Sequence, residues 1–253
     1  MKKRTLNIAS YIGFLILGFV LFNTFWWICA EIFQLKALPK PLDVYMSYNN
    51  AIEYGIGEHT LSSLKRILFG VFIALSIALI IGLWMGFNRT ANKLLSPLVY
   101  FTYPIPKLAL LPIVMVIFGI GETSKILIIV LIIVFQLIIS IRDAVKNVPK
   151  DSYDVLTSLK ASNWQKLRHI TIPAILPEIF SSLRISSGIA ISALFFTETF
   201  GTDKGLGFYI TDSWMRIDYL QMYFGIFMLS MIGLILFWTI DILDTVLCRW
   251  KRS

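Results

Sequence analysis

The sequence predicts an all-α membrane protein with six membrane-spanning helices and a polar two-helix loop between the fourth and fifth. Hydrophobic residues make up 57% of the 253 positions and charged residues only 15%, whereas about a quarter of the residues in soluble domains are charged. The apolar residues form long runs, and a helix of about 20 such residues matches the hydrocarbon thickness of a bilayer. Basic residues favour one side of these runs, which is typical of membrane topology.

Six apolar runs are long enough, or nearly so, to cross a membrane. We expect the spans at residues 8–28, 67–87, 97–118, 126–141, 179–200 and 223–247. The third run is broken by prolines and the fourth is short. A buried helix of a soluble core is the alternative for any single run, but six runs together favour spans.

The first run follows the basic stretch MKKR, as the apolar region of a secretory signal would. Its apolar stretch is too long for a signal, and no good small-residue cleavage site follows, so we expect a retained helix. The second run contains Gly82 and Gly86, a weak small-residue packing pattern that we expect to serve packing within the chain.

The distribution of Lys and Arg sets the expected orientation. With the N-terminus in the cytoplasm, basic residues are about twice as frequent in the inner segments as in the outer ones. Both termini are then cytoplasmic. The net charge of +8 is therefore interpreted as a topology signal and not as a nucleic-acid footprint, because the basic residues are scattered over several segments.

The longest inner segment, residues 142–173, has the pattern of two short amphipathic helices. Asp151 and Ser152 suit the start of the first helix. Ser162 and Gln165 form an S-x-x-Q capping box that predicts the start of the second.

Two prolines follow this helix pair. Pro173 is expected to end the second helix and Pro177 to begin the fifth span. The apolar faces of the pair must be covered. Packing on the membrane or on the bundle, and docking into a groove of a cytoplasmic partner, both remain open from the residues alone.

Four stretches resemble the permeases of ABC importers, in particular the aliphatic sulfonate, nitrate and taurine branch. Within the loop, Asp154 to Leu156 stands at the E-A-A position of the family's signature, Lys160-Ala161 at G-A, and Ile170 to Pro173 at I-x-L-P. The other three stretches are YPIPKLALLPIVMVIFGIGETSK (103–125), SLRISSG (182–188) and TETFGTDKGLGFYI (197–210). The resemblance runs from about Leu61 to the end of the sixth span.

The resemblance implies a type I importer permease in a bacterial inner membrane. Such a chain pairs with a second permease subunit, identical or different, and with two ATPase subunits that carry ATP and Mg. An extracytoplasmic binding protein delivers the solute. The sequence has no G-x-x-x-x-G-K-[ST] motif, so we expect no ATPase activity and no cofactor in this chain. The residues implied in ATPase docking are Tyr153, Asp154, Leu156, Lys160, Ala161, Ser162, Trp164, Gln165 and Arg168.

Two loop positions depart from the family pattern. Asp154 replaces a glutamate and is one methylene shorter. Lys160 replaces a glycine that usually adopts a left-handed backbone conformation, which costs an ordinary residue roughly 1 kcal/mol or more. Either Lys160 accepts this strain or the bend between the helices is made differently.

Ionisable and small polar residues within the spans are candidates for the translocation pathway or its gate, because a charge near the bilayer centre is costly. The candidates are Lys107, Arg184, Ser186, Ser187 and Glu198. Lys107 and Arg184 have the alternative of extending to the interface, and the serines that of close helix packing. Glu198 is expected at an outer gate or paired with a cation such as Lys204.

The branch handles small organic or inorganic anions such as sulfonates or nitrate, although relatives carry nitrogenous heterocycles. A second hypothesis is a non-transporting membrane scaffold or a weakly coupled partner in a heterodimeric permease. A membrane-embedded enzyme is disfavoured because the span charges are few and scattered. His59 and His169 are far apart in sequence and make no metal-ligand spacing, so we expect no metal site.

Overall fold

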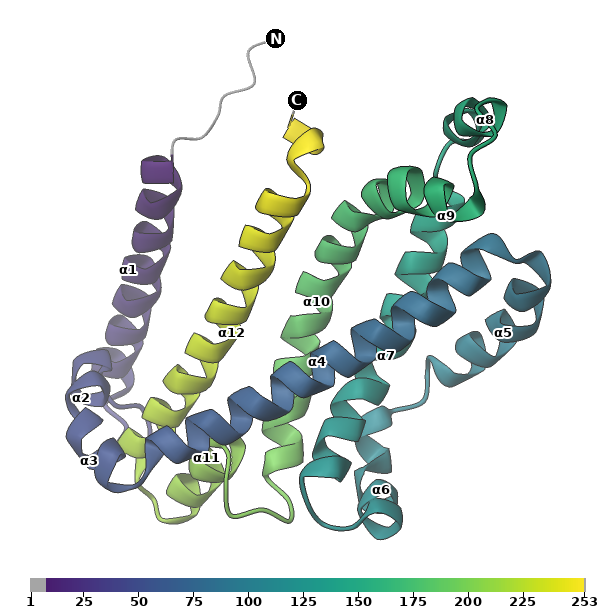
Figure 1. Cartoon of the computed structure of the whole chain (residues 1–253). Helices are drawn as coiled ribbons and strands as arrows, with labels where there is room; N and C mark the ends of the chain where they lie inside the picture. Colours follow the sequence, from purple (N-terminus) through teal and green to yellow (C-terminus); the bar gives the residue numbers. More distant parts are fainter. Residues whose placement is uncertain (1–7, 253) are drawn as a thin grey trace. The chain divides into compact units, whose positions relative to one another are not determined.

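The computed structural model describes residues 8–252, which form helices joined by short turns (Figure 1). The chain divides into two compact units. Unit 1 contains residues 8–56 and 209–227, and unit 2 contains residues 57–208 and 228–252. The longer elements are α1 (Ile8–Phe33), α4 (Ile56–Phe87), α5 (Arg89–Thr102), α6 (Leu111–Phe118), α7 (Glu122–Lys146), α10 (Ile172–Glu198), α11 (Leu206–Met215) and α12 (Tyr219–Leu247). The shorter ones are α2 (Pro41–Met46), α3 (Tyr48–Glu53), α8 (Lys150–Ser158) and α9 (Asn163–Lys166).

Five helices of the described part are long and apolar enough to cross a membrane, and a bent pair makes up to six. This confirms the all-helical fold class. The helices are longer than the apolar runs in the sequence: α4 begins at Ile56 rather than at residue 67, and α7 covers Glu122–Lys146 rather than 126–141. Their ends carry polar residues that hydropathy leaves out.

The third expected span, residues 97–118, is two helices at an angle. Arg89–Thr102 and Lys107–Phe118 are bent by 83° at the short break between them. Pro104 and Pro106 lie in this break. Each lacks a backbone N–H and its ring clashes with a preceding carbonyl, so a regular helix cannot continue through the pair. Pro112 is tolerated because it lies in the first turn of α6.

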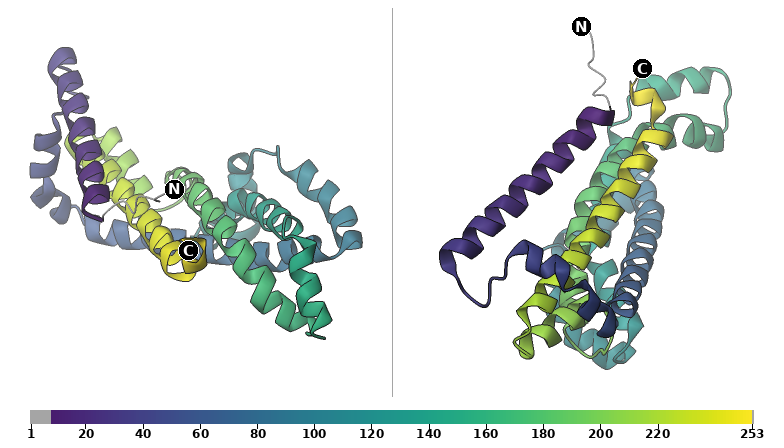
Figure 2. Two further views of the ribbon diagram at one scale, coloured as in Figure 1. Left: turned by 90° about the horizontal axis from the view of Figure 1, so that it is seen from above. Right: turned by 90° about the vertical axis from the view of Figure 1, so that its left-hand side faces the viewer.

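Helix α7 is the centre of unit 2, where it packs along α10 (Figures 1 and 2). Its side chains Ile128, Ile133 and Leu137 are completely buried. From α10, Ala190 and Leu194 are also completely buried. Burial of such side chains on a facing pair of helices fixes the rotation of α10 about its axis.

Glycines bring α4 close to α7. A Cβ added to Gly82 would lie 2.8 Å from Cβ of Ile141, and one added to Gly86 would lie 2.6 Å from Cβ of Val145. Both distances are shorter than real contacts allow. The glycine pair therefore serves packing within the chain, as the sequence predicts.

Pro173 does not end a helix. The segment Leu167–Thr171 is a single π-helical stretch, and Ile172 donates its N–H to the carbonyl of Leu167, five residues back. Pro173 follows in the first turn of α10, and Pro177 lies inside the same helix. A π-turn relocates hydrogen bonds that a proline would otherwise break. The expectation of a stop at Pro173 and a new start at Pro177 was therefore wrong.

Unit 1 is held by aromatic stacking and a buried amide. The Trp26 ring of α1 stacks on Tyr223 of α12 with centroids 5.4 Å apart. The Tyr209 hydroxyl donates to Gln221 Oε1 at 2.6 Å, and Gln221 Nε2 donates to the Ser47 carbonyl at 3.3 Å. Burial raises the pKa of Tyr209, so its hydroxyl keeps the proton that it donates.

Candidate functional site

The loop between α7 and α10 contains the two expected short helices, α8 and α9. Ser162 caps α9: its Oγ accepts from the Gln165 N–H at 3.3 Å, while Gln165 Oε1 accepts from the Ser162 N–H at 2.7 Å. This is the capping box that the sequence indicated. Asp151 lies in the first turn of α8, where a carboxylate favours the positive end of the helix.

Lys160 makes the bend between α8 and α9 by adopting a left-handed conformation, with φ of +56°. Its N–H bonds to the Thr157 carbonyl at 2.9 Å, and the Ala161 N–H bonds to the Leu156 carbonyl at 2.9 Å. This pair of bonds is a Schellman motif, whose left-handed position is usually a glycine. Lys160 thus accepts the strain, and the loop keeps the bend that a glycine would make.

The loop displays both apolar and charged side chains to solvent. Val155, Leu159 and Trp164 are 64%, 72% and 64% exposed. Among the predicted docking residues, those on the surface are Asp154, Lys160, Ser162, Trp164, Gln165 and Arg168, whereas Tyr153, Leu156 and Ala161 are half-buried. An exposed apolar patch with a charged rim is typical of a protein-interaction site.

A hydrogen bond ties the loop to the start of α10. The hydroxyls of Tyr153 and Thr171 are 2.9 Å apart, and Thr171 is completely buried. From Asn163 the chain runs as one helical segment of 36 residues to Glu198. The loop is therefore connected to the far end of unit 2 by continuous helical backbone.

Arg184 and the two serines of α10 lie in different surroundings. Arg184 forms an ion pair with Asp241 of α12, and both side chains are partly exposed. Ser186 and Ser187 are completely buried inside the chain, where the Ser187 hydroxyl donates to the Leu183 carbonyl at 2.7 Å. The placement of the serines fits close packing within the chain, and a pathway role for them stays a prediction.

Lys107 lies at the break between α5 and α6. It donates to the Tyr103 carbonyl, and its ammonium is 5.4 Å from the centre of the Tyr103 ring and 5.5 Å from that of Phe135. Carbonyl and ring faces both offset the charge of the lysine. Its predicted pathway role also remains untested.

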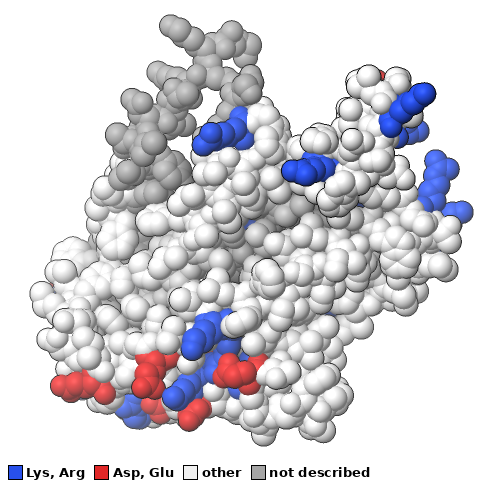
Figure 3. Space-filling view, in the orientation of Figure 1, with Lys and Arg blue, Asp and Glu red and all other residues white. Residues whose placement is uncertain are grey.

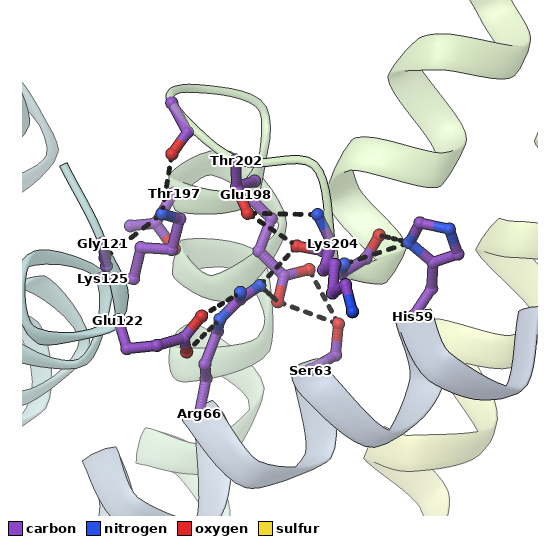
Figure 4. Close-up of polar contacts among 12 residues, drawn as sticks. His59, Ser63, Arg66, Gly121, Glu122, Lys125, Thr197, Glu198, Thr202 and Lys204 are labelled. Atoms are coloured by element: carbon purple, nitrogen blue, oxygen red, sulfur yellow. Dashed lines mark hydrogen bonds and ion pairs between the residues drawn. The ribbon is translucent and has the colours of Figure 1, made fainter.

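Glu198 lies in a buried polar cluster at the end of unit 2 opposite to α8 (Figure 4). Arg66 of α4 donates from Nη1 to Glu198 Oε1 at 2.8 Å and from Nε to Glu122 Oε2 at 2.7 Å. The Ser63 hydroxyl is 2.8 Å from Glu198 Oε2. Glu198 thus pairs with Arg66, and the expected pairing with Lys204 does not occur, because the Lys204 ammonium bonds to Glu58.

The charges in this cluster are nearly balanced. Arg66, Lys125 and Glu198 are at most 1% exposed, and Glu122 is 62% exposed at the rim. Lys125 donates to the carbonyls of Gly121 and Gly201 at 3.2 and 3.1 Å. Two cations and two carboxylates therefore share the site. Burial of each charge is tolerated because its hydrogen-bonding groups have partners.

Two glycines let the turn after α10 close over Glu198. The Gly207 N–H donates to Glu198 Oε2 at 2.9 Å. A Cβ added to Gly205, whose φ is +122°, would lie 2.4 Å from the Glu198 carboxyl carbon and 2.5 Å from Arg66 Nη1. The G-L-G stretch is therefore needed for the backbone to approach the ion pair.

Arg66 was missed by reasoning from the sequence, which counted it only as an outer basic residue. The signal was its position directly before the apolar run of residues 67–87, on the same helix as that run. Ser63, Arg66 and Gly70 are three and four residues apart, so they share one face of a helix. A Cβ added to Gly70 would lie 2.6 Å from Ile129 Cγ2 of α7, so this face points into unit 2.

Charged side chains are few over the middle of the surface that Figure 3 shows. Lys, Arg, Asp and Glu gather towards its upper and lower ends, and white marks every other residue. Among residues 8–252, no group of three or more His, Cys, Asp or Glu residues is arranged to hold a metal ion. The candidate site thus consists of the loop of α8 and α9, whose docking role stays a prediction, and the buried charge cluster around Glu198.

Comparison with known proteins identifies the family. The family described as "Binding-protein-dependent transport system inner membrane component" matches residues 67–252. The chain belongs to this family. It is therefore a permease of a binding-protein-dependent ABC importer and a multi-pass inner-membrane protein. Members of the family are not themselves ATPases, so the permease works with a separate ATPase and a binding protein.

Two relatives agree with this assignment, and a solved structure has a similar fold. The taurine transport system permease protein TauC of Escherichia coli (strain K12) is 34% identical over 195 residues, which are 74% of this chain and 71% of TauC. The nitrate import permease protein NrtB of Synechococcus elongatus is 28% identical over 205 residues, 77% of this chain and 74% of NrtB. A chain of the inward-facing MetNI methionine ABC transporter has a TM-score of 0.66 at 18% identity, covering 76% of this permease and 95% of that chain.

Proposed function

We propose that this permease forms a translocation pathway together with a second permease subunit, for a small organic or inorganic anion such as a sulfonate or nitrate. An extracytoplasmic binding protein delivers the anion. The names of the relatives support this class of solute, since TauC is a taurine permease and NrtB a nitrate permease. Two ATPase subunits bind ATP and Mg and drive transport by hydrolysis. Both termini of the permease lie in the cytoplasm.

The helical continuity from α9 to Glu198 carries the proposed mechanism. Within this segment, α10 alone has 27 residues and is about 40 Å long, which exceeds the thickness of the hydrocarbon core. ATPase closure moves the docked loop, and α10 transmits the movement as a rigid element. At the other end, Glu198 shifts relative to Arg66 and Ser63, and the turn that contains Gly205 moves with it.

The test is reconstitution with the candidate ATPase and binding protein in proteoliposomes. We expect the permease to co-purify with the ATPase, and hydrolysis to rise several-fold when binding protein and its anion are both present. Binding-protein ligands are identified by thermal shift, with taurine, nitrate and an uncharged heterocycle as probes. Stimulation by the uncharged compound alone would overturn the anion assignment while leaving the permease mechanism in place.

One observation favours the second candidate, a weakly coupled partner or scaffold. Lys160 occupies a position whose left-handed backbone normally belongs to glycine, so the docking loop of this subunit is strained. Reconstitution with this chain as the sole permease distinguishes the two. A homodimer that transports at a rate comparable to the native complex excludes the scaffold, whereas a complex that needs a different second permease supports it.

A further inference from the structure

A groove of about 980 Å³ in unit 2 lies beside the docking loop. Its walls come from the end of α4, the start of α5, the end of α7, and α8 with α9. The lining residues include Phe87, Arg89, Lys146, Lys150, Trp164 and Lys166. The elements that form these walls lie at the end of unit 2 that carries α8 (Figure 1).

The charged residues that line the groove are all basic. Four of its lining residues are basic, namely Arg89, Lys146, Lys150 and Lys166, and none is acidic. Asp151 and Asp154 of α8 are exposed and do not line it. In Figure 3, Lys and Arg side chains predominate at this end of unit 2. Like charges around one concavity repel each other, and an anion bound there would offset that repulsion.

One of the four cations is held in place by the fold. Lys146 Nζ donates to Asn92 Oδ1 at 2.9 Å, which directs this side chain from α7 towards α5. Among residues 8–252, no carboxylate forms an ion pair with Arg89, Lys150 or Lys166. These three side chains are therefore available to a ligand.

The groove is also apolar on one side. Phe87 is 53% exposed and Trp164 is 64% exposed, and Val145, Val148 and Leu167 add further apolar surface. A small inorganic anion would make no use of these side chains. A phospholipid has both parts, since its phosphate matches the cations and its acyl chains match the apolar wall. Tryptophan is also enriched where a bilayer meets water.

We propose that this groove binds an anionic phospholipid, with Arg89, Lys150 and Lys166 contacting the phosphate and Phe87 and Leu167 contacting the acyl chains. A zwitterionic lipid is bound less well, because its own cationic group faces the four basic side chains. The lipid bridges α5 to the docking loop and so restricts the positions of α9.

Thermal unfolding of the full-length permease in a neutral detergent tests this proposal. A ligand that binds only the folded state raises the melting temperature. We expect phosphatidylglycerol to raise it more than phosphatidylcholine at the same mole fraction. The triple variant Arg89→Gln, Lys150→Gln, Lys166→Gln should lose at least half of this difference. Lys93→Gln, an exposed lysine of α5 outside the groove, should retain it.

Single variants provide a second test in case the triple variant does not fold. Lys150→Gln and Lys166→Gln should each reduce the number of phosphatidylglycerol molecules retained in native mass spectrometry, with Lys93→Gln as the matched control. Equal shifts with both lipids, an unchanged shift in the triple variant, or a shift reproduced by inorganic phosphate would each overturn the proposal. Loss of the lipid effect once the ATPase is bound would overturn it too, because the groove would then belong to the ATPase interface.

Discussion

Arg66 and Glu198 form an ion pair between α4 and α10 in which Nη1 and Oε1 are 2.8 Å apart and both side chains are at most 1% exposed. The same carboxylate accepts hydrogen bonds from Ser63 and from the Gly207 N–H. Two helices and the turn after α10 thus meet at one carboxylate. Loss of the Arg66 charge leaves Glu198 buried without its ion-pair partner, and loss of the Glu198 charge leaves the buried Arg66 with only the exposed Glu122; either is costly for such a pair.

We therefore expect Arg66→Met and Glu198→Gln each to lower the free energy of unfolding by about 3–5 kcal/mol. The double variant Arg66→Met, Glu198→Gln should lose less than the sum of the two single losses. Denaturant titration in detergent measures both. The exposed pair Lys204–Glu58 provides the control, and Glu58→Gln should cost at most about 1 kcal/mol. Additive losses would show that the pair is not coupled.

Lys160→Gly should relieve the strain at the bend of the docking loop. Glycine adopts the left-handed conformation without the penalty of a Cβ, so the folded loop should gain about 1 kcal/mol, partly offset by the greater freedom of glycine in the unfolded chain. The check is hydrogen exchange of the backbone amides at positions 160 and 161, which should be slower in the variant than in the wild type. Ser158→Gly in α8 is the matched control and should have the opposite effect, with faster exchange in α8.

Asp154→Arg should uncouple ATP hydrolysis from transport without preventing membrane insertion, because Asp154 is exposed on the docking loop and supports no buried contact. Charge reversal places repulsion at the proposed ATPase contact. Uptake and ATPase stimulation in proteoliposomes measure the effect, and size-exclusion chromatography checks insertion. Asp154→Glu, which restores the residue typical of the family, should keep transport. Wild-type uptake by Asp154→Arg would argue against the docking role.

Gly86→Val should disrupt the packing of α4 on α7, since even a Cβ at this position would lie 2.6 Å from Cβ of Val145. Overpacking of this kind lowers the free energy of unfolding by about 1–3 kcal/mol. A lower melting temperature of the variant would show this loss. Gly57→Ala is the control in the same helix. A Cβ there meets no atom within 4 Å, and replacing a helical glycine with alanine should stabilise the protein by about 0.5–1 kcal/mol.

The sequence was sufficient to predict the parts of this fold that depend on local patterns. Apolar runs located the spans, and the pattern of Ser162 and Gln165 located the start of α9. The G-x-x-x-G spacing of Gly82 and Gly86 indicated a close helix contact. Each of these signals lies within a few residues of the structure that it predicts.

Features that depend on distant residues were not predictable in the same way. The partner of Glu198 is Arg66, which is 132 residues away in the sequence, and Lys204 was a more obvious candidate by proximity. The 83° bend at Pro104 and Pro106 depends on where α6 can pack, and a proline alone does not set its angle. Pro173 did not stop the helix, because the π-turn before it rearranged the hydrogen bonds.

That π-turn fixes the direction in which the docking loop points. A turn of this type contains one more residue than an α-helical turn, and each residue of an α-helix corresponds to a rotation of about 100° about the axis. Side chains before Leu167 are therefore rotated about the helix axis by about 100°, relative to the positions that an uninterrupted α-helix would give them on the buried face of α10. Deleting one residue between 167 and 171 would restore a regular α-helix and rotate Trp164 about the helix axis. The direction in which the loop points therefore depends on the number of residues in this turn and not only on their types.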